Sequence, residues 1–123
     1  MLLPRPLIRK ASVPEEAVTR VTHAGDTVIV SLSGEVDVLT VDRVRVALSE
    51  ALAARPRRVE VDLAELSFID VRGVEELVEL ARQVAPAGRV KVISPPVAMR
   101  RILEVAGWEP ELDLVEDLER ERK

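Results

Sequence analysis

The chain contains no cysteine and no tyrosine, and only one histidine, one phenylalanine and one tryptophan. Without cysteine there is no disulfide framework, thiolate metal site or nucleophilic thiol, and His23 alone cannot assemble a zinc cluster. Phe68 and Trp108 are too few to build stacking platforms for bases or sugars. A net charge of −4 offers no field that attracts a phosphate backbone. We therefore expect no metal site and no nucleic-acid partner.

Long apolar runs are also absent. No stretch of the sequence approaches the roughly 20 apolar residues that a membrane-spanning helix needs. The opening Met1-Leu2-Leu3-Pro4-Arg5-Pro6 has neither the basic start nor the apolar stretch of a secretion signal. These features predict a cytoplasmic protein that does not insert into a membrane.

The residues that are present fit one compact domain. The chain has 123 residues, of which 47% are hydrophobic, and its 21 valines favour a sheet. A chain of this length buries roughly two-thirds of its unfolded surface, so it needs no covalent staple. Prolines and the lack of periodicity predict a loosely ordered segment over residues 1–16, followed by the domain over 17–118 and a charged tail over 119–123.

Hydrophobic periodicity predicts an α/β fold. An initial hairpin, with its turn at Ala24-Gly25-Asp26, precedes an alternation of helices and strands. Residues 112–115 fit either a last strand or the start of a helix. The sheet should be mixed and mostly parallel, with right-handed crossovers and helices packed against it. The predicted strands are 18–21, 27–32, 59–63 and 90–93, and the predicted helices are 40–54, with Thr40 as N-cap, 71–85 and 96–106.

Polar side chains follow two of the predicted strands. Gly34 breaks the second strand, and the loop after it contains Glu35 and Asp37. The loop after the third strand contains Ser67, Phe68, Asp70 and Gly73. Because the carboxyl ends of parallel strands meet at one edge of a sheet, the two loops should be neighbours. For the two aspartates, helix capping and turn formation are favoured over catalysis, because no base or metal ligand accompanies them. We expect no catalytic residue and no cofactor.

Arg72 is unusual for its place. A cation in the first turn of a helix opposes the helix dipole and loses about 0.3–1 kcal/mol relative to a neutral residue. Two interpretations remain open. Arg72 pairs with Glu75 or Glu76 on its own helix, or it contacts a group outside the domain.

Three segments together resemble the STAS domain of anti-sigma factor antagonists. They are Ser-Gly-Glu-Val-Asp-Val-Leu-Thr-Val at 33–41, Val-Glu-Val-Asp-Leu at 59–63 and Leu-Ser-Phe-Ile-Asp-Val-Arg-Gly-Val at 66–74. The resemblance extends from about Val18 to Val115. It implies a small α/β domain in which helices back a sheet.

The resemblance also draws attention to one loop. In such antagonists the loop after the third strand usually reads Asp-Ser-Ser-Gly. Its first serine is phosphorylated by an anti-sigma factor that is itself a kinase, and the added charge breaks their complex. Here Asp70 and Gly73 match, but Val71 and Arg72 replace the serines. Valine has no hydroxyl, so Val71 cannot accept a phosphate.

The function implied is a regulatory protein-interaction module. It would bind an anti-sigma factor, or a related kinase of the ATPase-fold type, without serine phosphorylation at the usual site. An accessory STAS subunit of a lipid-transporting ATPase is the alternative. The sequence leaves open the oligomeric state and whether a hydroxyl such as that of Ser67 or Thr40 is phosphorylated instead. The expected partner-binding residues are Glu35, Asp37, Thr40, Asp70, Val71, Arg72 and Gly73.

Overall fold

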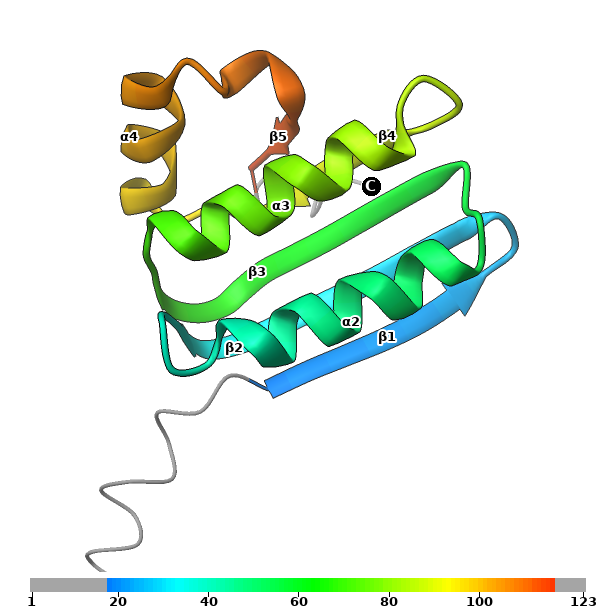
Figure 1. Cartoon of the computed structure of the whole chain (residues 1–123), viewed down its shortest axis with the longest axis horizontal. Helices are drawn as coiled ribbons and strands as arrows, with labels where there is room; N and C mark the ends of the chain where they lie inside the picture. The colour runs from blue at the N-terminus through cyan, green and yellow to red at the C-terminus, as the bar shows by residue number, and fades with distance from the viewer. Residues whose placement is uncertain (1–17, 117–123) are drawn as a thin grey trace, which may run out of the picture.

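The computed structural model of the protein describes residues 18–116. An initial hairpin is followed by alternating helices and strands, as Figure 1 shows. The predictions for 1–16 and 119–123 lie outside the described residues. The elements are β1 Val18–Ala24, β2 Thr27–Val36, α2 Val41–Ala53, β3 Arg58–Ile69, α3 Val71–Val84, β4 Arg89–Ile93, α4 Val97–Ala106, η2 Glu109–Glu111 and β5 Asp113–Val115.

The strands form one five-stranded sheet in the order β1-β2-β3-β4-β5. β1 runs antiparallel to β2, and all other neighbours pair in parallel. The hairpin turns at Gly25, whose φ of +65° suits a residue without a Cβ. The predicted α/β fold with a mixed, mostly parallel sheet is confirmed. Residues 113–115 form a strand, which decides between the two predicted alternatives.

The helices gather on one face of the sheet. Successive parallel strands are also neighbours in the sheet, so right-handed crossovers place their helices on the same side. Figure 1 shows α2 and α3 side by side across this face. Val28, Val30 and Leu32 of β2 point into the core beneath them, whereas Ile29 and Ser31 are only partly buried. Within residues 18–116 no helix covers the opposite face.

Apolar residues at helical spacing are buried on α2 and α3, whereas on α4 Met99 and Leu103 are buried and Ala106 is exposed. Val44 of α2, Leu77 of α3 and Leu103 of α4 have no exposed surface. Glu76 of α3 lies 3.0 Å from the Nε of Arg45 on α2. This hydrogen bond, together with the carboxylate charge, raises the pKa of Arg45 above its ordinary value. Trp108 is partly buried and packs against the core from the turn after α4.

Three strands are longer than predicted at their carboxyl ends, and the first of them, β1, continues past Val21 to Ala24. β2 continues past Gly34 to Val36, and β3 continues past Leu63 to Ile69, so Ser67 and Phe68 lie in a strand and not in a loop. For β2 and β3 the reason is two register shifts between them, at Ser31/Ser33 and at Gly34/Glu35. Each shift breaks the alternation of apolar and polar residues by which a strand is recognised in sequence.

Candidate functional site

Three segments meet where the parallel strands end. We call this region the carboxyl-end edge, comprising residues 35–40, 67–73 and 94–102. In Figure 1 it is the left side, where α2 and α3 begin and α4 stands. The backbone N–H of Asp70 donates to the carbonyl of Val36 at 3.0 Å, so the ends of β2 and β3 are joined directly. The prediction that the two loops are neighbours is confirmed.

The loop between β2 and α2 is closed by Asp37 and Thr40. Oδ1 of Asp37 accepts hydrogen bonds from the N–H groups of Leu39 at 2.9 Å and of Thr40 at 3.2 Å. The Thr40 hydroxyl donates to the carbonyl of Glu35 at 2.7 Å and accepts from the N–H of Asp37 at 3.0 Å. Thr40 is the N-cap residue of α2, as predicted, but it is buried and its hydroxyl makes no capping hydrogen bond to the helix. Both side chains organise the loop.

This internal bonding leaves two apolar side chains at the tip of the loop. Val38 is 58% exposed and Leu39 is 87% exposed. Both follow Asp37 directly, so the turn that Asp37 closes directs them outward. Glu35 lies opposite Phe68 in the sheet register and is partly exposed beside it.

The start of α3 is built around Asp70. Its Oδ1 accepts from the N–H groups of Arg72 at 3.0 Å and Gly73 at 3.2 Å, so Asp70 is the N-cap, as the capping interpretation predicted. The free amide donors of this helix end are thereby partly occupied by the protein's own carboxylate. Val71, the position of the missing serine, is 49% exposed.

Gly73 sets how closely α3 approaches the sheet. It is buried, and a Cβ at this position would lie 2.7 Å from side-chain carbons of both Ile69 and Val36. No side chain fits without movement of its neighbours. Gly73 therefore positions Val71 and Arg72 rather than offering a contact surface of its own.

Arg72 is exposed and forms no ion pair within residues 18–116. Of the two acids that could neutralise it from its own helix, Glu76 is held by Arg45 of α2. No hydrogen bond or ion pair joins the side chains of Arg72 and Glu75 within the same described range. Of the two interpretations, pairing on the helix surface is not observed.

A groove runs between the start of α3 and α4. Six of its eight lining residues are apolar, and Asp70 and Arg101 are the charged ones. Phe68 is 44% exposed and Val97 is 69% exposed. The lining residues are Phe68, Ile69, Asp70, Val71, Val97, Ala98, Arg101 and Ile102.

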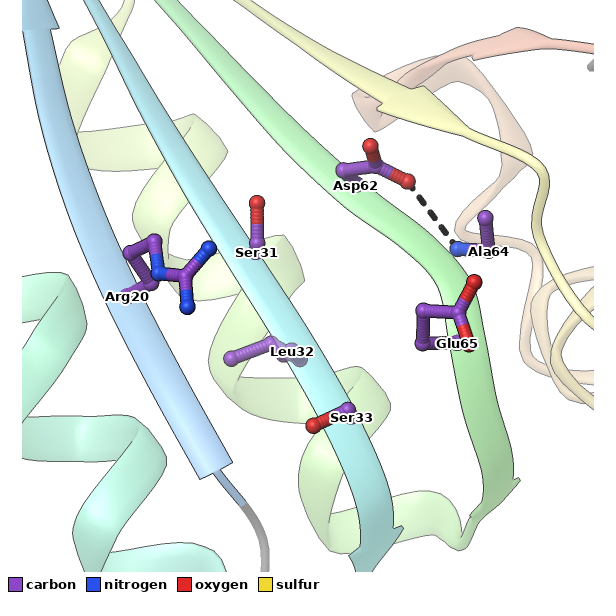
Figure 2. Close-up of a pocket in the computed structure, with 7 residues that line it drawn as sticks. All are labelled: Arg20, Ser31, Leu32, Ser33, Asp62, Ala64 and Glu65. Atoms are coloured by element: carbon purple, nitrogen blue, oxygen red, sulfur yellow. Dashed lines mark hydrogen bonds between the residues drawn. The ribbon is translucent and has the colours of Figure 1, made fainter.

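A second hollow lies on the sheet face that the helices leave open (Figure 2). Arg20, Ser31, Ser33, Asp62 and Glu65 line it from three adjacent strands. Asp62 accepts a hydrogen bond from the N–H of Ala64 at 3.0 Å, which is drawn in Figure 2. This hollow carries both signs of charge but no histidine, lysine or thiol that could serve as a catalytic base or nucleophile.

The part of the chain that the structure describes has neither a metal-binding cluster nor a membrane-spanning helix. Among residues 18–116, no group of three His, Asp or Glu side chains is placed to hold a metal ion. No helix in this range is long and apolar enough to cross a membrane.

The pattern of the whole chain decides the family. The family model described as "Mlab, STAS domain" matches residues 19–116. The chain belongs to the STAS domain family. An anti-sigma F factor antagonist from Lysinibacillus sphaericus is 32% identical to this STAS domain over 97 residues, which cover 77% of this chain and 79% of that protein.

Solved structures show the same fold. An anti-sigma factor antagonist from Mycobacterium paratuberculosis superposes with a TM-score of 0.75 at 24% identity, covering 85% of this chain and 89% of that one. SpoIIAA, a Bacillus cell fate determinant, has been solved unphosphorylated and phosphorylated. Its unphosphorylated form gives a TM-score of 0.66 at 25% identity and covers 85% and 94% of the two chains. This STAS domain is thus anti-sigma-factor-antagonist-like.

The edge of this STAS domain differs in part from the expected site. Four of the expected residues hold the loops and the start of α3 in place, namely Asp37, Thr40, Asp70 and Gly73. Val71 and Arg72 are exposed to solvent. Val71 is among the residues expected from the sequence, but Val38, Leu39, Val97 and Arg101 are not. The pair Val38-Leu39 could have been noticed in the sequence. Two apolar residues in a short loop between a strand and a helix are not placed to enter the core, so they indicate an exposed apolar surface.

Proposed function

We propose that this STAS domain is a regulatory protein-interaction module that binds an anti-sigma factor, or a related kinase of the ATPase-fold type, through its carboxyl-end edge. Glu35, Val71 and Arg72 would contact the partner. Asp37, Thr40, Asp70 and Gly73 would hold the contacting loops in place. The module would carry out no chemistry of its own.

The observation that carries the proposal is the apolar surface at this edge. Leu39, Val71 and Val97 stand on three different segments that meet there, and all are at least about half exposed. Monomeric proteins rarely expose contiguous apolar patches, and such patches mark sites of association. The relatives named as anti-sigma factor antagonists support a protein as the partner.

The proposal includes the absence of a phosphate switch. Val71 stands at the phosphoacceptor position and has no hydroxyl. Thr40 is buried with its hydroxyl hydrogen-bonded on both sides, and the Ser67 hydroxyl donates to the carbonyl of Gly34 at 2.9 Å. A kinase would have to break these contacts to reach either hydroxyl. Control would therefore lie in the abundance of the module or in its partner.

The test uses an ATPase-fold anti-sigma kinase from the same genome. Calorimetric titration with and without ATP should give the same Kd, and the intact mass should show no added phosphate. The variant Val71→Ser/Arg72→Ser should gain one phosphate, because it restores a hydroxyl at the phosphoacceptor position at the start of α3. It should then bind the kinase more weakly in ATP, because the phosphate adds negative charge at the contact surface. The matched variant Arg72→Ser should remain unlabelled.

Three results would contradict the proposal. Phosphate on Ser67 or Thr40 of the unaltered protein, with a loss of affinity, would restore a switch. Equal binding after disruption of the carboxyl-end edge would move the contact surface elsewhere. Failure to bind any such kinase, together with stoichiometric co-purification with a lipid-transporting ATPase, would favour the accessory-subunit alternative.

A further inference from the structure

The groove between α3 and α4 is lined mostly by apolar side chains, together with one cation and one carboxylate. Phe68 and Val71 contribute from the β3–α3 junction, and Val97 and Ile102 contribute from α4. These side chains are close to the core but are not covered by it, since Phe68, Val71 and Val97 remain between 44% and 69% exposed. An apolar side chain from another molecule would complete their burial.

The charges around the groove do not cancel. Asp70 contributes one negative charge, which its hydrogen bonds from the N–H groups at the start of α3 hold in place but do not remove. Arg101 lines the groove and Arg72 directly follows the lining residue Val71 on α3, and neither arginine forms an ion pair within the described residues. Arg100, their neighbour in sequence, is by contrast paired with Glu116. The two exposed guanidinium groups of Arg72 and Arg101 thus outnumber the single carboxylate of Asp70 at this groove.

We infer that this groove receives a segment of the partner protein that presents an apolar side chain flanked by carboxylates. The inference rests on the proposed function and specifies the chemistry of the partner's contact. Arginine and aromatic side chains around a desolvated apolar anchor are typical of the residues that dominate protein interfaces. Charges at the rim of an interface select among partners, so the two arginines would favour an acidic segment over a basic one.

Other occupants fit these observations less well. An anionic lipid surface or a nucleic acid is extended and would face much of a chain whose net charge is −4, whereas a short acidic segment meets only the groove. A small ligand is usually held in a pocket that buries most of its surface. This groove is more open, since Phe68, Val71 and Val97 are between 44% and 69% exposed. A protein segment needs only one face buried.

The experiment uses two synthetic amphipathic peptides of about 16 residues with the same leucine face. One carries glutamates beside that face and the other carries lysines. Each is titrated into the full chain labelled with nitrogen-15, and amide shifts are followed by NMR. The acidic peptide should shift amides of residues 68–73 and 97–102 and bind about tenfold more tightly than the basic peptide.

Charge reversal gives the sharper comparison. Arg72→Glu/Arg101→Glu should reverse the order of the two peptides while retaining the thermal midpoint, since both side chains are exposed and unpaired in the described structure. The matched control is Arg57→Glu/Arg58→Glu, which makes the same charge change at the start of β3, at the opposite end of the strand from the groove. The control should keep the original preference, which separates a local effect from one of net charge.

Several outcomes would overturn the inference. They are equal binding of both peptides, no binding of either, or amide shifts confined to the open sheet face. A kinase that binds the Arg72→Glu/Arg101→Glu variant as tightly as the unaltered protein would reject this groove while the proposed function stands. A peptide preference in the absence of any kinase binding would reject the proposed partner while the groove stands.

Discussion

The carboxyl-end edge and the open face of the sheet are both accessible to solvent, but they carry different side chains. The edge presents Leu39, Val71 and Val97, whereas the open face presents hydroxyls and charges of both signs around Arg20 and Asp62. A polar sheet face is well solvated without a partner, whereas a large exposed apolar patch marks a site of association. Under the proposed function, the edge is therefore the surface that contacts another protein.

The largest losses of stability are expected for the buried side chains of the helices, which pack on the sheet and support both regions. Leu77→Ala or Leu103→Ala should lower the free energy of unfolding by about 2–5 kcal/mol, because both side chains are fully buried and leave a cavity. Urea denaturation measures this. Val105→Ala, at a position on α4 that is 89% exposed, is the control and should change stability by less than about 0.5 kcal/mol. Equal costs for the three variants would contradict the assignment of the helical faces.

Gly73→Ala tests whether the edge depends on close packing. The added Cβ would meet Ile69 and Val36 at 2.7 Å, so we expect a loss of about 1–3 kcal/mol by the overpacking of the core. Ser49→Ala on the exposed side of α2 is the control for helix propensity. Glycine to alanine stabilises a helix at a solvent-exposed position. The same result for Gly73→Ala would show that α3 does not need to lie so close to the sheet.

Asp70→Ala tests the cap of α3. Removal of the carboxylate leaves two amide donors without their acceptor and should lower the free energy of unfolding by about 1 kcal/mol. Asp70→Asn retains an acceptor oxygen and should recover most of that loss. An unchanged denaturation midpoint for Asp70→Ala would mean that the cap does not stabilise the start of α3.

The smallest effect on stability is expected at the edge itself. Leu39→Ser and Val97→Ser should change the free energy of unfolding by less than about 0.5 kcal/mol, because both side chains are already solvated. Each should weaken binding of the kinase by about 1–2 kcal/mol if it lies in the contact. Val46→Ser, at a 67% exposed position on α2, serves as control and should affect neither quantity.

Much of the fold could be predicted from the sequence because periodicity reports which side of each element is buried. The stripes on α3 and the alternation in β2 both follow this rule. The full length of β3 could not be predicted, since register shifts interrupt the alternation after Leu63. Thr40 holds the predicted N-cap position, but the loop as a whole decides that its hydroxyl bonds back to Glu35 and not to the helix.

The candidate site was predictable only in part for a related reason. Asp70, Val71 and Arg72 are consecutive, so their place at the start of a helix follows from local sequence. The groove combines Phe68 and Val71 with Val97 and Arg101, which lie more than twenty residues further along the chain. Such a juxtaposition depends on how α4 packs near α3, and no local pattern specifies it.

Hydrogen–deuterium exchange on the complex with the anti-sigma kinase, in the presence of ATP, tests the central claim most directly. The account predicts protection of residues 37–40, 70–73 and 97–102, unchanged exchange in the exposed residues of β1, and an unmodified mass for every peptide that covers Val71. Protection of β1 and the open sheet face with no change at the carboxyl-end edge would contradict it.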